Sequence, residues 1–140
     1  MAIICLEGAS GIGKTNAAQF MAEKYGFVRI AEVNELFERS SDETEDWNFQ
    51  MQVRRWELAR DVSESGNIAI LDGDHLQPIW FNWIFEDFNF RPVSEVLAFY
   101  SKVFSKGKLD FPDAYVVLSL EIDELRSRKE KDTARSRIDF

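Results

Sequence analysis

The chain has 140 residues, of which 45% are hydrophobic and 30% charged, and its formal net charge is -8. This length suits one domain with one core. The acidic balance disfavours broad binding to nucleic acid or anionic membranes, but a nucleotide ligand needs only a local positive site. The single cysteine, Cys5, excludes an internal disulfide and is expected to pack as a small buried hydrophobe. With no signal peptide and no apolar run long enough to span a membrane, the sequence predicts a reducing, cytoplasmic location.

Residues 8–15 read GASGIGKT and match the phosphate-binding pattern GxxxxGK[ST]. A predicted strand over 2–6 precedes this phosphate-binding loop and a predicted helix over 14–24 follows it, as the chemistry requires. Glycines let backbone amides curl around a phosphate, and the helix directs its positive end at the same phosphate. Lys14 adds a mobile charge, and the Thr15 hydroxyl can hold Mg²⁺. The residues predicted to bind the nucleotide here are Gly8, Ser10, Gly11, Ile12, Gly13, Lys14, Thr15 and Asn16. The alternative is a glycine-rich turn before an ordinary helix.

The rest of the chain predicts strands and helices in alternation. We expect strands over 27–30, 68–71 and 115–120, helices over 47–64, 77–86, 93–105 and 122–131, and a polar loop over 40–46. Behind a phosphate-binding loop, this order predicts an α/β fold with helices on both faces of a parallel sheet. Ligands bind such sheets outside the carboxyl ends of the strands. This rule selects residues 8–15, 32–35 and 72–75 and whatever follows Leu120.

Acidic side chains follow two of the predicted strands. Asp72, in the sequence LDGDH at 71–75, is predicted to act on Mg²⁺ through a coordinated water. Asp74 is close enough to repel it, and a divalent cation or a basic ligand would relieve that repulsion. Either Glu32 or Asp74 is predicted to take the proton of an acceptor hydroxyl. The alternatives are a simple turn at residues 72–74 and a helix N-terminal acid at Glu32.

Two further groups of residues have competing interpretations. His75 is the only histidine, and we expect a packed polar side chain rather than a proton-transfer group. Its isolation excludes a His/Cys zinc site. The dense aromatic residues between 80 and 90 either pack in the core, line an acceptor pocket or form a homodimer interface.

Residues 126–137 carry six basic and two acidic side chains in an otherwise acidic chain. One interpretation is a solvated helix face with i,i+4 pairs such as Arg126–Glu130. We favour a phosphate clamp, because a phosphate-binding loop is also present.

Together these motifs resemble those of P-loop small-molecule kinases, a group that includes thymidylate and deoxynucleoside kinases and chloramphenicol phosphotransferase-like proteins. The likeness rests on EGASGIGKT at 7–15, the acid at Glu32, LDGD at 71–74 and LRSRKEKDTARSR at 125–137. The resemblance implies a three-layer fold with kinase-type strand order over residues 1–140, and ATP with Mg²⁺ as cofactors. It also implies a lid at about 125–137 whose arginines close over the phosphates, with Arg128, Arg135 and Arg137 as the clamps.

This chain departs from the pattern in two places. Gly73 stands where the nucleoside kinases usually have an arginine. Those kinases also continue past the lid with a fifth strand and a helix, so the resemblance predicts a chain truncated at its C terminus or a sheet completed by another element.

The predicted function is ATP-dependent transfer of the γ-phosphate to a hydroxyl or phosphate of a nucleoside, nucleotide or antibiotic-like small molecule. Lys14, Glu32, Asp74, Arg128 and Arg135 are the predicted catalytic residues, and Thr15 and Asp72 the metal ligands. The alternative is an ATP-binding or hydrolysing module without a small-molecule acceptor. A GTPase is disfavoured because no DxxG follows the strand at 68–71 and no NKxD segment is present. Neither nucleic acid nor membrane is an expected partner.

Overall fold

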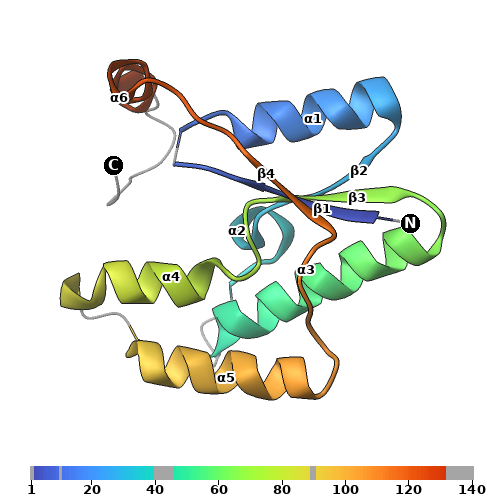
Figure 1. The fold of residues 1–140 in the computed structure, drawn as a ribbon, viewed down its shortest axis with the longest axis vertical. Helices are drawn as coiled ribbons and strands as arrows, with labels where there is room; N and C mark the ends of the chain where they lie inside the picture. Colours follow the sequence, from blue (N-terminus) through green and yellow to red (C-terminus); the bar gives the residue numbers. More distant parts are fainter. Residues whose placement is uncertain (1, 10, 40–45, 89–90, 132–140) are drawn as a thin grey trace.

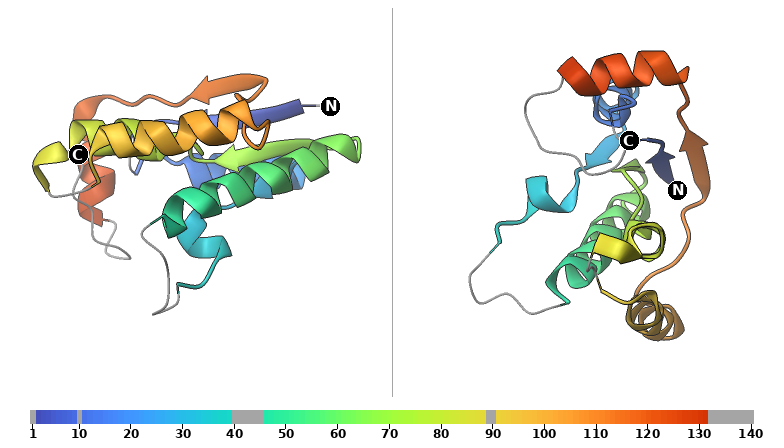
Figure 2. Two further views of the ribbon diagram at one scale, coloured as in Figure 1. Left: turned by 90° about the horizontal axis from the view of Figure 1, so that it is seen from below. Right: turned by 90° about the vertical axis from the view of Figure 1, so that its left-hand side faces the viewer.

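The computed structural model describes residues 2–9, 11–39, 46–88 and 91–131. Figure 1 shows the elements in chain order, and Figure 2 shows them from two further sides. They are β1 (Ala2–Glu7), α1 (Lys14–Tyr25), β2 (Val28–Ile30), α2 (Val33–Leu36), α3 (Trp47–Glu64), β3 (Ile68–Asp72), α4 (Gln77–Ile84), the 3₁₀ helix η1 (Glu86–Phe88), α5 (Val93–Ser105), β4 (Ala114–Val117) and α6 (Ile122–Lys131).

The four strands form one parallel sheet in the order β2-β3-β1-β4. Helix α1 covers one face, and α3 covers the other with α5 beyond it (Figures 1 and 2). The predicted α/β fold with helices on both faces of a parallel sheet is therefore confirmed. Because all strands are parallel, their carboxyl ends meet at one end of the molecule, which is the end where ligands bind in such sheets.

Both faces of the central strands are buried. Beyond Ile68, every residue of β3 is buried, as expected of a strand covered on both faces. Leu71 packs in the larger cluster with Trp56 of α3, while Ile70 points to the smaller cluster with Ala18 of α1. Cys5 is fully buried in the larger cluster, which confirms its predicted packing role. Burial raises the pKa of its thiol, so Cys5 is an inert part of the core.

The predicted helices over 47–64, 93–105 and 122–131 are confirmed with those bounds. The predicted helix over 77–86 ends earlier, at Ile84, and the chain continues into η1. The predicted strand over 115–120 is shorter, because its neighbour β1 ends at Glu7. The amide of Leu118 makes the last bond, to the Glu7 carbonyl at 2.8 Å, and no further partner follows.

Besides η1, the helix α2 was not predicted. The four-residue helix α2 follows directly after β2 and is too short to show helical periodicity in the sequence. The carbonyl of Glu32 accepts hydrogen bonds from the amides of Glu35 and Leu36, which begins the helix. The predicted loop over 40–46 lies outside the described residues except for Asp46. None of the described helices combines the length and apolarity that crossing a bilayer requires.

Candidate functional site

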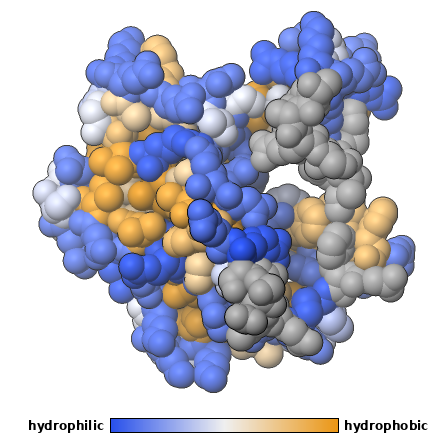
Figure 3. All heavy atoms as spheres, turned by 180° about the vertical axis from the view of Figure 1, so that it is seen from behind, coloured by the Kyte–Doolittle hydropathy of each residue, from blue (hydrophilic) through white to orange (hydrophobic). Residues whose placement is uncertain are grey.

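A cavity of about 850 Å³ lies at the carboxyl ends of the strands. Seen from behind, the molecule is hollowed on the right-hand side at this end (Figure 3). The cavity is lined by the phosphate-binding loop, the segments that follow β2 and β3, one side of α3 and one side of α4. Its lining includes these predicted site residues: Gly8, Gly11, Ile12, Gly13, Lys14, Thr15, Asn16, Glu32, Asp72 and Asp74.

The phosphate-binding loop has the backbone conformation that its glycines permit. Gly11 and Gly13 have φ values of +82° and +106°, a region that other residues rarely adopt. Gly13 caps α1 without a side-chain hydrogen bond, so the amides of the first turn have no competing cap. The Lys14 ammonium donates to the Gly8 carbonyl at 2.7 Å and so lies over the loop. This arrangement presents backbone amides and one cation to an anion in the cavity.

Gly8 joins the loop tightly to the end of the sheet. A Cβ on Gly8 would lie 2.8 Å from the carbonyl oxygen of Leu118, so only glycine fits there. Glu7 precedes it, and one of its carboxylate oxygens accepts from the Gly8 amide at 2.8 Å. The other, Oε2, has no hydrogen-bond partner among the described residues. Burial raises the pKa of Glu7. Glu7 was not among the predicted site residues, although it lines the cavity. It directly follows a predicted strand, which is where ligand-binding residues are expected in such sheets.

Asp72 ends β3 with its side chain fully buried, and an arginine neutralises it. Its Oδ2 accepts from Nε and Nη2 of Arg29, on the adjacent strand β2, at 3.0 and 2.8 Å. The same guanidinium donates to both carboxylate oxygens of Glu35 at 3.0 and 2.7 Å. Hydrogen bonds to Glu35 and then to Asp72 raise the pKa of Arg29, so its charge is permanent. This pairing could not be predicted from a local pattern, because Arg29 and Asp72 are 43 positions apart.

The oxygen atoms at this end of the sheet suit a magnesium ion. Oδ1 of Asp72 is buried and has no partner among the described residues, and Asp72 lines the same cavity as Thr15. No group of three or more His, Cys, Asp or Glu residues in the described part of the chain is arranged to hold a metal. A magnesium ion usually takes one or two protein oxygens and otherwise relies on water and substrate phosphates, and Thr15 and Asp72 are oxygen donors that fit such a site.

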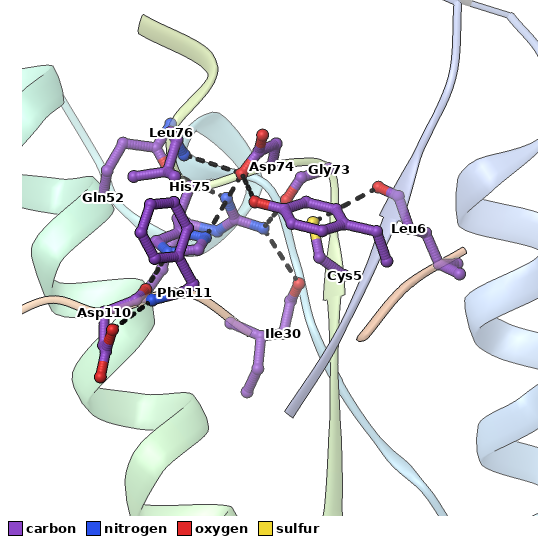
Figure 4. A network of polar contacts seen from close by, with 12 residues as sticks. Cys5, Leu6, Ile30, Gln52, Gly73, Asp74, His75, Leu76, Asp110 and Phe111 are labelled. Carbon is purple, nitrogen blue, oxygen red and sulfur yellow. Dashed lines mark hydrogen bonds and ion pairs between the residues drawn. The ribbon is translucent and has the colours of Figure 1, made fainter. Parts of the chain in front are cut away.

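Glu32 and Asp74 lie at neighbouring strand ends. A Cβ on Gly73 would be 3.9 Å from Oε1 of Glu32, which shows how close the two segments run. Asp74 is held in a turn, because its Oδ1 accepts from the Leu76 amide at 3.0 Å and from the Tyr115 hydroxyl at 3.3 Å (Figure 4). Both acids line the cavity.

His75 is a packed residue, as predicted. Its ring is fully buried and stacks on Trp56 with centroids 4.8 Å apart. Nε2 lies 2.8 Å from the Asp110 carbonyl and therefore carries the proton, since a carbonyl only accepts. Nδ1 faces Asp74 at 3.4 Å. Burial lowers the pKa of His75, so the neutral form is the one that fits this site.

The aromatic residues of α4 and η1 divide between two environments. Trp80, Phe81 and Phe85 line the cavity, which is compatible with an acceptor pocket, one of the three alternatives given for these residues. Trp83 and Phe88 are exposed, at 64% and 57% of their surface. Three polar residues of α3 also line the cavity but were not predicted: Asn48, Gln52 and Arg55. Their spacing of four and three places them on one helix face.

The described part of the predicted lid, residues 125–131, lies beside the phosphate-binding loop. Nη1 of Arg128, on α6, donates to the carbonyl of Ile12 at 3.1 Å, and its Nε lies 3.3 Å from Glu124. A Cβ on Gly11 would lie 3.2 Å from the side chain of Lys129. Arg128 is therefore near the predicted phosphate site, although it does not line the cavity. Three predicted residues, Ser10, Arg135 and Arg137, lie outside the described residues.

Comparisons with known proteins point to kinases. The chain is 27% identical over 141 residues to the deoxyguanosine kinase of Bacillus subtilis (strain 168), covering 91% of this chain and 65% of that protein. Its fold is similar to that of a deoxyadenosine kinase from M. mycoides with bound dATP, with a TM-score of 0.56 at 16% identity, over 93% of this chain and 71% of that one. A thymidylate kinase from Ehrlichia chaffeensis gives a TM-score of 0.54 at 17% identity, over 91% and 81%. No family model matches the chain.

This chain has the P-loop kinase fold. The predicted resemblance to nucleoside and nucleotide kinases is confirmed by the sequence relative and by both structures. The chain spans 65% of the length of its sequence relative. The two predicted alternatives for the C-terminal side, a truncated chain or a sheet completed by another element, stay predictions.

The Arg29–Asp72 pair can be tested through stability. Arg29→Met leaves a fully buried carboxylate without its counter-ion and is expected to lower the free energy of unfolding by about 3–5 kcal/mol. Glu35→Gln is the matched control, because it alters the exposed side of the same guanidinium and should change stability by less than about 1 kcal/mol. Urea titrations at neutral pH measure both. Equal stability of Arg29→Met and wild type would contradict the prediction.

The buried neutral His75 predicts a pH dependence of stability. Its pKa is lowered in the folded state, so the unfolded chain binds the proton first, and stability falls as the pH drops below the ordinary value of 6.5. His75→Phe keeps the stacking on Trp56 but cannot titrate. Between about pH 7.5 and pH 5.5, we expect the free energy of unfolding to decrease more in wild type than in His75→Phe. The carboxylates titrate in both proteins, so parallel curves would show that His75 contributes nothing.

Proposed function

We propose that this chain is an ATP-dependent kinase that transfers the γ-phosphate of ATP·Mg to a hydroxyl or phosphate of a nucleoside or nucleotide. The observation that carries the proposal is that two kinds of wall line one cavity. The phosphate-binding loop forms part of its wall, and carboxylates and aromatic rings that suit an acceptor form another part. The kinase names of the relatives give independent support.

The donor side would work by position and charge. Backbone amides at Gly11 and Gly13 and in the first turn of α1 would surround the β- and γ-phosphates, and the ammonium of Lys14 would move from the Gly8 carbonyl to a phosphate oxygen. The Thr15 hydroxyl and, through water, Asp72 would hold Mg²⁺, which neutralises charge on the transferring group. Arg128 lies next to the loop and needs only a short movement to reach a phosphate. Ser10, Arg135 and Arg137 keep their predicted roles as further phosphate ligands.

The acceptor side would orient the attacking oxygen. Glu32 lies at the cavity wall at the end of β2, and we propose it as the group that takes the hydroxyl proton. Asp74 is engaged by the Leu76 amide and the Tyr115 hydroxyl, which fixes the turn beside Glu32. Bringing the two substrates together in this geometry and stabilising the charge would supply most of the acceleration.

The cavity wall favours a planar acceptor. Trp80, Phe81 and Phe85 give one side an aromatic surface, on which a heterocycle can stack. Gln52 and Asn48 add amide groups that can bond the edge of such a ring. We propose deoxynucleosides and nucleotides as the first acceptors to assay. The cytoplasmic location, the homodimer and the absence of nucleic-acid and membrane partners stay predictions.

Lys14→Ala tests the proposal directly. Removing the only cation of the loop should lower phosphoryl transfer by at least about 100-fold and leave the fold intact, since Lys14 is at the surface of the cavity. Lys24→Ala, at the other end of the same helix, is the control and should transfer normally. The assay is coupled ADP formation over a panel of nucleosides and nucleotides, with circular dichroism to verify folding.

Two outcomes would change the conclusion. Normal transfer by Lys14→Ala would contradict the proposed role of the loop. ADP formation by wild type that is independent of every acceptor would instead support an ATP-hydrolysing module.

A further inference from the structure

Arg55 is a charged residue in the interior of the protein. Only 1% of its surface is exposed, yet it extends from α3 to the ends of two strands. Nε donates to the Ala31 carbonyl at 2.7 Å, and Nη2 donates to the carbonyls of Asp72 and Gly73 at 3.0 and 3.1 Å, with Ile30 at 3.4 Å. Nη1 donates to Oε1 of Gln52 at 2.8 Å. Figure 4 shows Ile30, Gly73 and Gln52 around this centre.

All five of these acceptors are neutral, which is unusual for a buried guanidinium. A buried charge is normally paired with an opposite charge, because its desolvation is costly. Burial lowers the pKa of Arg55, and the carboxylates of Glu32, Asp72 and Asp74 act in the opposite direction from farther away. A hydrophobic residue at position 55 would avoid the cost of removing a charged guanidinium from water. What the arginine provides, and a hydrophobic residue cannot, is hydrogen bonds to the backbone carbonyls.

These contacts begin where the sheet hydrogen bonds end. The β2–β3 ladder has its last pair at Ile30 and Leu71, so beyond it the two chain segments are no longer paired with each other. Ala31 precedes Glu32, and Gly73 precedes Asp74. The Arg55 guanidinium donates to carbonyls of both segments. It therefore connects them at the point where the next β2–β3 hydrogen bonds would otherwise lie. A rigid fork of donors can do this in one plane, whereas a lysine has a single nitrogen.

We propose that Arg55 is a positioning residue that sets the separation of Glu32 and Asp74 and the orientation of the Gln52 amide at the cavity. An arginine only donates, so Gln52 must turn its oxygen toward Arg55 and its nitrogen elsewhere. The catalytic part of this inference rests on the proposed kinase function. The structural part does not, because it concerns the order of the two strand ends.

Hydrogen exchange on the full-length chain tests the structural part without any activity. The amides of Leu36 and Leu76 bond to Glu32 and Asp74 and report on the two segments. In Arg55→Lys we expect these two amides to exchange at least about tenfold faster than in wild type, while amides in α1 do not change. Arg54→Lys is the matched control, because the neighbouring Arg54 is exposed and its side chain bonds to Glu57, on the same helix.

Kinetics test the catalytic part. With an acceptor that wild type phosphorylates, Arg55→Lys should lower kcat by about 100-fold, since a misplacement near 1 Å has that effect, and leave the KM for ATP unchanged. A general loss of structure would instead change both parameters. If Arg55→Lys does not fold, Arg55→Gln is the second variant, with the same expected exchange pattern.

The outcomes separate the two proposals. Wild-type exchange at Leu36 and Leu76 in a folded Arg55 variant would overturn the positioning role. Faster exchange with unchanged kcat would overturn its catalytic part. If wild type transfers phosphate to no acceptor, the proposed function fails, while the exchange data still decide whether Arg55 holds the strand ends.

Discussion

At the carboxyl ends of the parallel strands, carboxylates and backbone carbonyls lie beyond the hydrogen bonds of the sheet. The rest of the site depends on which groups bond to them. Two arginines do this from different directions. Arg29 lies within the sheet and neutralises the buried carboxylate of Asp72. Arg55 enters from α3 and bonds backbone carbonyls of both strand ends. An unpaired buried acid or a set of orphaned carbonyls would cost several kcal/mol. The arginines therefore make it possible for functional acids to lie at the cavity wall while the sheet below them stays apolar.

The two sides of the cavity depend on the sequence in different ways. The phosphate-binding loop has glycines in conformations that only glycine adopts readily, so the residues at 8–15 indicate its conformation directly. The opposite side, the proposed acceptor wall, is assembled from β2, β3, α3 and α4, which are far apart in the sequence. Its shape depends on tertiary packing, including the stacking of His75 on Trp56 and the bond from the Tyr100 hydroxyl to the His75 carbonyl at 2.9 Å.

This difference explains what could be predicted from the sequence. The loop, the order of strands and helices, and the acids after β2 and β3 follow from local signals, and the structure brings Glu32, Asp72 and Asp74 into one cavity with the loop. The Arg29–Asp72 and Arg55 contacts could not be predicted, since they join residues 17 to 43 positions apart through side-chain packing. Helix α2 was missed because four residues are too few for a periodic pattern. The end of β4 was predicted too late, because it is set by the end of its partner β1 and not by its own apolar run.

Asp72 shows how one carboxylate can serve two partners. Oδ2 receives both hydrogen bonds from Arg29, and Oδ1 is left without a partner among the described residues. A guanidinium on one oxygen does not prevent the other from accepting a hydrogen bond from a metal-bound water, since a carboxylate has about four lone-pair sites. The charged guanidinium of Arg29 lies on the adjacent strand and compensates the buried carboxylate of Asp72. A water-mediated contact to Mg²⁺ would also suit an ion that gives up its hydration reluctantly. In the proposed kinase, the arginine and the metal would act on the same acid in turn: the arginine bonds to Oδ2 in the folded protein, and a metal-bound water would bond to Oδ1 when the nucleotide binds.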